Sequence, residues 1–80
     1  METKEIYRTK ELSEAAALIV SKQRLIQIQR QGKICWFLFE NAQKCQEISD
    51  EFFFGELMAN AREYYETITR LKNRIFAGQK

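Results

Sequence analysis

The sequence predicts a small α+β domain in which a helix, a β-hairpin and two further helices follow one another (α-β-β-α-α), with a possible extra N-terminal strand. Two apolar-rich runs on either side of Gln31-Gly32 have the composition of paired strands. The flanking segments carry apolar residues at the three- and four-residue spacing of helices. No proline or linker divides the 80 residues. We therefore treat 1–80 as one domain and expect residues 1–5 and 78–80 to be frayed.

The hairpin connection depends on Gly32, which can adopt positive φ without a steric penalty. We expect a two-residue turn at Gln31-Gly32. This register pairs Arg30 with Lys33, Ile28 with Cys35, and Ile26 with Phe37. The competing register is a three-residue loop with a bulge at Gly32. It would place Gln27 and Gln29 among the apolar residues of the second strand, so the first register is preferred.

Side chains alternate along a strand, so the predicted hairpin has two different faces. The core face carries Ile26, Ile28, Cys35, Phe37 and Phe39. The second face is mixed and carries Leu25, Gln27, Gln29, Ile34, Trp36 and Leu38. Either the domain's own elements cover this second face or it contacts a partner. Its apolar members Ile34, Trp36 and Leu38 form the candidate contact face.

The first part of the chain predicts a short strand and a helix. Ile6-Tyr7-Arg8 could add a third strand, because two strands alone are marginally stable. A helix is expected from Glu11 to Lys22, with Thr9 as its N-cap. The apolar run in this helix, which includes three consecutive alanines, indicates burial over much of its circumference.

Two more helices are expected after the hairpin. The second begins at the cap Asn41, runs to about Phe54 and stops at Gly55, with an inner stripe of Cys45, Ile48, Phe52 and Phe53. The third begins with Asn60 and Glu63 as a variant capping box and ends at Gly78. Its apolar stripe is Tyr64, Ile68, Leu71 and Ile75, and Glu66 and Arg70 are spaced for an ion pair. We expect one core cluster of Phe37, Phe39, Ile26, Ile48, Phe52, Ile68 and Leu71.

Residues that would support catalysis are scarce. The chain has no histidine, the commonest general base, and its glycines are too scattered for a phosphate loop. We interpret Cys35 and Cys45 as buried free thiols, and Glu47, Asp50 and Glu51 as a solvated helix face. The sequence thus predicts no enzyme activity, cofactor, metal or small-molecule substrate. It shows no membrane span or signal peptide, so we expect no membrane partner and a cytoplasmic location.

Charge is unevenly distributed, although the net charge is only +2. Residues 20–39 contain four basic and no acidic side chains, whereas residues 40–59 have a net charge of −4. One hypothesis is a protein-binding or self-associating module anchored by Trp36 with Ile34 and Leu38. The alternative is a nucleic-acid binder with Arg24, Arg30 and Lys33 on phosphates and Trp36 stacked on a base. The pI of about 8.6 is low for a nucleic-acid-binding domain, which favours the first hypothesis.

Several segments together resemble a known family. They are Tyr7-Arg8-Thr9-Lys10-Glu11-Leu12, an alanine-rich helix, Phe37-Leu38-Phe39-Glu40, Phe53-Phe54-Gly55-Glu56, Ala61-Arg62-Glu63-Tyr64 and Leu71-Lys72. The chain resembles a family of short prokaryotic and viral proteins known only as a domain of unknown function. The resemblance implies a stand-alone α-β-β-α-α domain from a virus or mobile element, without an assigned activity. Where the family tends to place a glycine before the first hairpin strand, this chain has Ser21-Lys22-Gln23.

Overall fold

The computed structural model describes residues 5–77, and the order of their elements confirms the predicted fold class. The elements are β1 (Tyr7–Thr9), α1 (Leu12–Val20), β2 (Leu25–Gln31), β3 (Ile34–Phe39), α2 (Ala42–Phe53) and α3 (Ala61–Ala77). β1 is the extra N-terminal strand that the sequence suggested. Of the residues expected to be frayed, only Glu5 is described, and its carbonyl accepts a bond from the Ala42 N–H at 3.1 Å. The expected stop at Gly78 lies outside the described residues.

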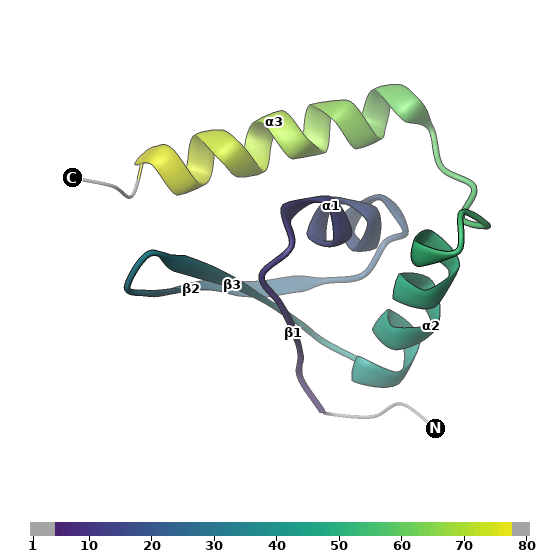
Figure 1. Ribbon diagram of the computed structural model, residues 1–80, viewed down its shortest axis with the longest axis horizontal. Helices are drawn as coiled ribbons and strands as arrows, with labels where there is room; N and C mark the ends of the chain where they lie inside the picture. The colour runs from purple at the N-terminus through teal and green to yellow at the C-terminus, as the bar shows by residue number, and fades with distance from the viewer. Residues whose placement is uncertain (1–4, 78–80) are drawn as a thin grey trace.

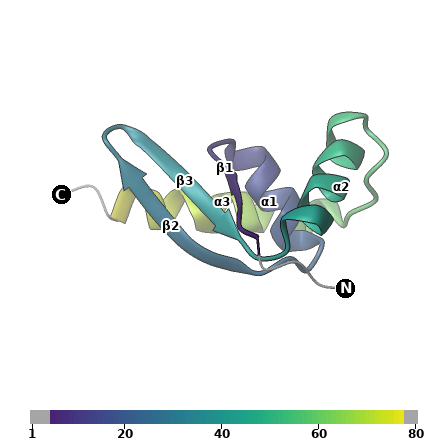
Figure 2. The same ribbon diagram turned by 90° about the horizontal axis from the view of Figure 1, so that it is seen from below.

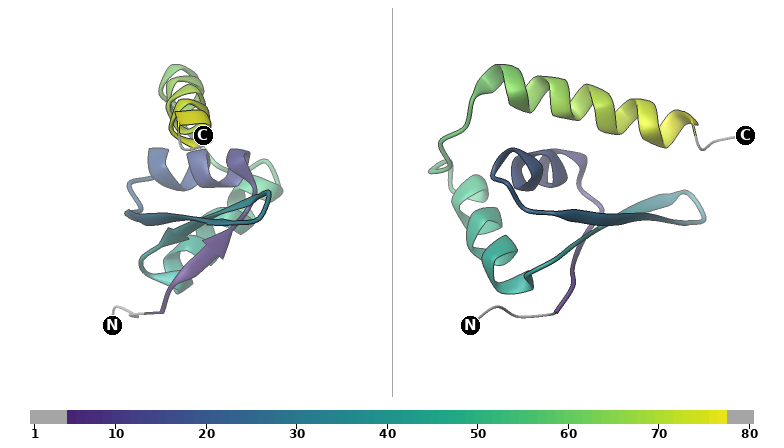
Figure 3. Two further views of the ribbon diagram at one scale, coloured as in Figure 1. Left: turned by 90° about the vertical axis from the view of Figure 1, so that its left-hand side faces the viewer. Right: turned by 180° about the vertical axis from the view of Figure 1, so that it is seen from behind.

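The elements form three layers, with α1 in the middle (Figures 1 and 3). The lowest layer in Figure 1 is an antiparallel sheet with strand order β1-β3-β2. Helix α3 lies over α1 on the side away from the sheet, and α2 packs against α1 beside these layers. The central position of α1 explains its composition. Ala15, Ala16 and Ala17 are at most 1% exposed, and their methyl groups let other elements approach the helix closely.

The core is built around two phenylalanines of the central strand. Phe37 and Phe39 of β3 are 1% and 0% exposed, and they cluster with Leu18, Cys45, Ile48 and Leu71. Ile68 packs against this cluster while partly buried, as the predicted core requires, whereas the assignment of Phe52 to the core is wrong, because Phe52 does not belong to the cluster. Both cysteines are free thiols, with Cys45 buried and Cys35 half-buried.

The predicted hairpin register is wrong by two residues. The turn is formed by Gly32-Lys33, so that Gln31 pairs with Ile34 and Ile28 with Phe37. Gly32 has φ 63° at the first central position of the turn. A two-residue turn suited to the strand twist needs positive φ at that position, which the predicted register would have assigned to Gln31. Because the shift is even, it leaves Ile28, Cys35 and Phe37 on the core face.

A bulge at the start of β2 overturns the core assignment of Ile26. Leu25 pairs with Phe39 and Gln27 with Leu38, so Ile26 is an extra residue without a partner on β3. The bulge moves Leu25 to the core face, where it packs against the cluster, and leaves Ile26 45% exposed. Strict alternation predicts the reverse, with Ile26 on the core face and Leu25 on the second face.

Helix α1 differs from its prediction at both ends. It begins at Leu12 with Glu11 as the N-cap, and the Thr9 hydroxyl accepts the Glu11 N–H at 3.1 Å in a local turn. It stops at Val20, earlier than expected. The Lys22 N–H bonds to the Ile19 carbonyl and the Gln23 N–H to the Leu18 carbonyl, at 2.9 and 3.0 Å. This is a Schellman ending, with Lys22 in the left-handed conformation at φ 70°.

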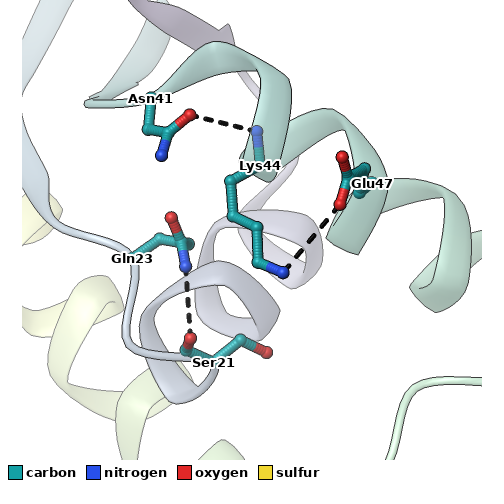
Figure 4. Close-up of polar contacts among 5 residues, drawn as sticks. All are labelled: Ser21, Gln23, Asn41, Lys44 and Glu47. Carbon is teal, nitrogen blue, oxygen red and sulfur yellow. Dashed lines mark hydrogen bonds and ion pairs between the residues drawn. The ribbon is translucent and has the colours of Figure 1, made fainter. Parts of the chain in front are cut away.

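The predicted caps of the other two helices are confirmed. The Asn41 side chain accepts the Lys44 N–H at 3.2 Å (Figure 4). The same figure shows the Lys44–Glu47 ion pair and the bond from the Gln23 amide to the Ser21 carbonyl. The Asn60 side chain accepts the Glu63 N–H at 3.0 Å and starts α3.

The inner stripe of α2 was predicted one residue too wide. Cys45 and Ile48 are buried and Phe52 is half-buried beside Tyr64, with ring centroids 6.3 Å apart. Phe53 is 81% exposed, because one further residue turns the helix by about 100°. Gly55, with φ 74°, then ends the helix.

Candidate functional site

The candidate contact face lies on the side of the sheet away from α1 and α3. Cross-strand pairs share a face of a sheet. The pairs Arg8–Leu38, Gln27–Leu38, Gln29–Trp36 and Gln31–Ile34 therefore define this surface, which we call the open face. Figure 2 looks onto this side of the molecule, and within residues 5–77 no helix passes in front of β2 and β3. The structure thus brings Ile34, Trp36 and Leu38 together on one surface.

Polar side chains of the same face hold Trp36 in place. The Arg8 guanidinium lies over the Trp36 ring, 4.8 Å from its centroid, as in a cation–π contact. The indole N–H donates to Gln31 Oε1 at 3.1 Å. Trp36 is consequently half-buried without any helix above it, and Leu38 on the same face is half-buried as well. Towards the ends of the face, Ile34 is 42% exposed, and Ile6, just before β1, is 46% exposed.

The basic residues of the nucleic-acid alternative do not converge on Trp36. Arg30 pairs with Cys35 on the core side of the sheet, and its guanidinium donates to the Ile75 carbonyl at 2.9 Å. Arg24 precedes β2 and lies 3.7 Å from the carboxylate of Glu40. Lys33 is in the turn at the opposite end of the hairpin. These three cations therefore surround the hairpin rather than form one stripe beside the indole ring.

A second apolar surface, at the end of α2, was not predicted from the sequence. Phe53, Phe54 and Met58 are 81%, 71% and 91% exposed, and we call these three residues the aromatic corner. The rings of Phe53 and Phe54 meet edge-to-face, with centroids 5.3 Å apart. The signal for this surface was three consecutive phenylalanines at a helix end, because one helix stripe cannot bury all three.

A polar cluster joins β1, α1 and α2. The carboxylate of Glu14 accepts bonds from the hydroxyls of Tyr7 and Ser49, and from the Thr9 hydroxyl at 2.5 Å. Burial raises the pKa of Tyr7 to about 12, and the bond to Glu14 adds to this shift. Burial also raises the pKa of the Cys45 thiol to about 11, with a further contribution from the Glu14 charge. At neutral pH both groups keep their protons. The Tyr7 hydroxyl ties β1 to α1, the Cys45 thiol donates to the Glu40 carbonyl at 3.3 Å, and the Ser49 hydroxyl ties α2 to α1.

Two further findings concern metal binding and membrane spanning. Across residues 5–77, no three side chains of the types that bind metals lie together. In the same stretch, no helix has both the length and the apolar character needed to cross a bilayer.

Comparisons with known proteins bear on the family of this chain. Neither the curated proteins nor the solved structures yielded a match. A family model, in contrast, matches residues 4–77, which is nearly the whole chain. The chain therefore belongs to the family described as a domain of unknown function (DUF5659).

Proposed function

We propose that this domain is a non-enzymatic protein-binding module whose open face docks a protein partner, most simply a second copy of itself. The observation that carries the proposal is the position of Ile34, Trp36 and Leu38 on a sheet face that no described helix covers. A small domain gains stability when such a surface is buried, because each Å² of apolar area removed from water contributes about 25 cal/mol.

The composition of the open face supports a protein partner. Its centre is an aromatic ring, and its surroundings are the polar side chains of Arg8, Gln27, Gln29 and Gln31. Protein interfaces commonly combine an aromatic anchor with a polar rim. Because Gln31 already accepts the indole N–H, Trp36 can be buried against a partner without leaving an unpaired donor.

A second copy would pack its own open face onto the first. Two sheets that pack face to face lie about 10 Å apart, with their side chains interdigitated. A stable dimer of this kind needs roughly 800 Å² of buried surface on each copy.

The two free cysteines support a reducing cytoplasmic setting as part of the proposal. The family resemblance supports the viral or mobile-element origin.

The placement of the basic residues supports protein binding over nucleic-acid binding. A hairpin that enters a groove would need Trp36 and its cations on one surface, whereas Arg30 extends towards α3 on the other side of the sheet. A mobility-shift assay at low salt with pools of DNA and RNA tests the alternative. Binding that falls with salt and disappears on charge reversal of Arg24, Arg30 and Lys33 would favour nucleic acid.

The dimer is tested by light scattering at increasing protein concentration. We expect the wild type to exceed the monomer mass, and Trp36→Ser or Leu38→Glu to return it to monomer with unchanged secondary structure by circular dichroism. The matched control is Phe53→Ser combined with Phe54→Ser, which removes apolar surface elsewhere and should leave the mass unchanged. A wild type that stays monomeric at high concentration would rule out the dimer. Loss of mass in the control variant would show that the interface is formed by the aromatic corner instead.

A further inference from the structure

A groove of about 710 Å³ lies between strand β2 and the C-terminal half of α3. It arises because α1 runs across α3 rather than along it. α1 separates only part of α3 from the sheet, and the seventeen-residue α3 continues above the hairpin beyond α1 (Figures 1 and 3). At the hairpin end, the bond from Arg30 to the Ile75 carbonyl ties the sheet to α3.

The groove is apolar inside and positively charged along α3. Leu25 and Ile28 line it from the sheet, and Ile19 and Leu71 from the helices. Arg70 and Arg74, one turn apart on α3, are its only charged residues within the described chain, and both are exposed. The expected ion pair between Glu66 and Arg70 is not formed within residues 5–77. Both guanidinium groups are therefore available to an anionic ligand.

The groove also follows a free strand edge. In the order β1-β3-β2, strand β2 pairs only with β3 among the described strands. Four consecutive residues of β2 line the groove and no residue of β3 does, so the groove lies over the unpaired side of β2. Alternate residues of an edge strand direct their backbone N–H and C=O groups outward, where an added strand can bond to them.

We propose that this groove binds an extended acidic segment of another protein, which adds to β2 as a fourth strand. Backbone bonds to β2 beyond the bulge at Ile26 would supply affinity, as in other proteins that bind peptides by strand addition. Every second side chain of the segment would enter the groove. Apolar ones would lie over Leu25 and Ile28, and carboxylates two positions away would pair with Arg70 and Arg74.

Two other occupants fit the groove less well. If two copies paired antiparallel through β2 about Gln27, Arg24 of each copy would lie opposite Arg30 of the other, and like charges in that position are destabilising. A nucleic-acid strand would find two cations for its phosphates, but its polar backbone would also face an apolar floor. An acidic peptide with apolar residues matches both properties of the groove.

Selection from a display library of random ten-residue peptides tests the proposal on the full chain. We expect the selected pool to be enriched in Asp and Glu two positions from apolar residues. Binding should fall at least tenfold in the groove variant, Arg70→Glu with Arg74→Glu. The control variant, Arg62→Glu with Lys72→Glu, makes the same charge change on α3 outside the groove and should bind as the wild type does. Circular dichroism establishes that both variants are folded.

The same selection can overturn the proposal. It fails if no peptide is enriched, if the enriched peptides lack acidic residues, or if the groove variant binds them as well as the control does. It also fails if binding of a labelled single-stranded oligonucleotide depends on Arg70 and Arg74 while binding of no peptide does. The Trp36→Ser variant should still bind the selected peptides and lose only the dimer. That result would separate this site from the open face.

Discussion

Two pairs of phenylalanines show how differently the same side chain is used in this domain. Phe37 and Phe39, two residues apart on the central strand, are fully buried beneath α1. Phe53 and Phe54, adjacent at the end of α2, extend into solvent and contact each other. A spacing of two residues on a strand directs both rings to one face, whereas adjacent positions on a helix diverge. The first pair thus stabilises the core, and the second leaves apolar surface available for contact.

The largest expected effect is at the central strand. Phe37→Ala or Phe39→Ala removes a buried ring and leaves a cavity, so each should cost about 3–5 kcal/mol of unfolding free energy. That loss is comparable to the whole stability of a domain of this size. Urea denaturation followed by circular dichroism measures it. Melts that match the wild type would show that these rings are not in the core.

Alkaline pH should loosen the polar cluster around Glu14 that joins β1, α1 and α2. The pKa of Tyr7 is about 12 in the folded chain and about 10 when unfolded, so its stabilising contribution is complete below pH 10 and disappears by pH 12. The Cys45 pKa of about 11 acts in the same direction from about pH 9. The urea midpoint should therefore fall between pH 9 and 12, and less steeply above pH 10 in Tyr7→Phe. Identical slopes in both proteins would contradict this role for Tyr7.

The start of α3 should have an intermediate effect. Asn60→Ala removes the side-chain acceptor of the Glu63 N–H and should cost about 1 kcal/mol. Because Asn60 lies outside both the open face and the groove, neither proposed binding activity should change. Denaturation and the two binding assays check this expectation. An unchanged midpoint would mean that the cap contributes nothing measurable.

A substitution at the end of α1 should stabilise the centre slightly. Lys22 has φ 70°, a conformation that is costly for a side chain with a Cβ and free of strain for glycine. Lys22→Gly should therefore raise the unfolding free energy by up to about 1 kcal/mol, partly offset by the greater entropy of the unfolded chain. Thermal melting measures the change. A lower melting temperature would show that the Lys22 side chain contributes a contact larger than its strain.

The smallest expected effect completes the comparison of the two phenylalanine pairs. Phe53→Ser and Phe54→Ser replace exposed rings, so each should change stability by no more than about 0.5 kcal/mol. The same urea melts used for Phe37→Ala provide the measurement. A loss of several kcal/mol would mean that the aromatic corner is buried in solution, for example against another molecule.

Much of the fold was predictable because periodicity and capping are local properties of the chain. The stripe of α3 was identified correctly from spacing, and the caps Asn41 and Asn60 from residue type. The hairpin register and the exposure of Ile26 were predicted incorrectly. The register depends on which central position Gly32 occupies, and the bulge depends on how β2 curves against the rest of the domain. Neither property is encoded in hydrophobic alternation.

The candidate surfaces were less predictable than the fold. Alternation placed Ile34, Trp36 and Leu38 on one face correctly, because an even shift of register preserves faces. It could not show that Arg30 reaches α3, since that contact joins residues 45 positions apart. The groove depends on how far α3 extends past α1, a property of packing that no single segment carries.

The central position of α1 means that this domain has no separable half. A nine-residue helix is too short to persist in water, so α1 forms only where the sheet, α2 and α3 already surround it. Conversely, the sheet and α3 meet mainly through α1, and each loses its support when α1 unfolds. Folding of the chain should consequently be all-or-none, and a fragment cut between the hairpin and α2 would remain an unstructured peptide.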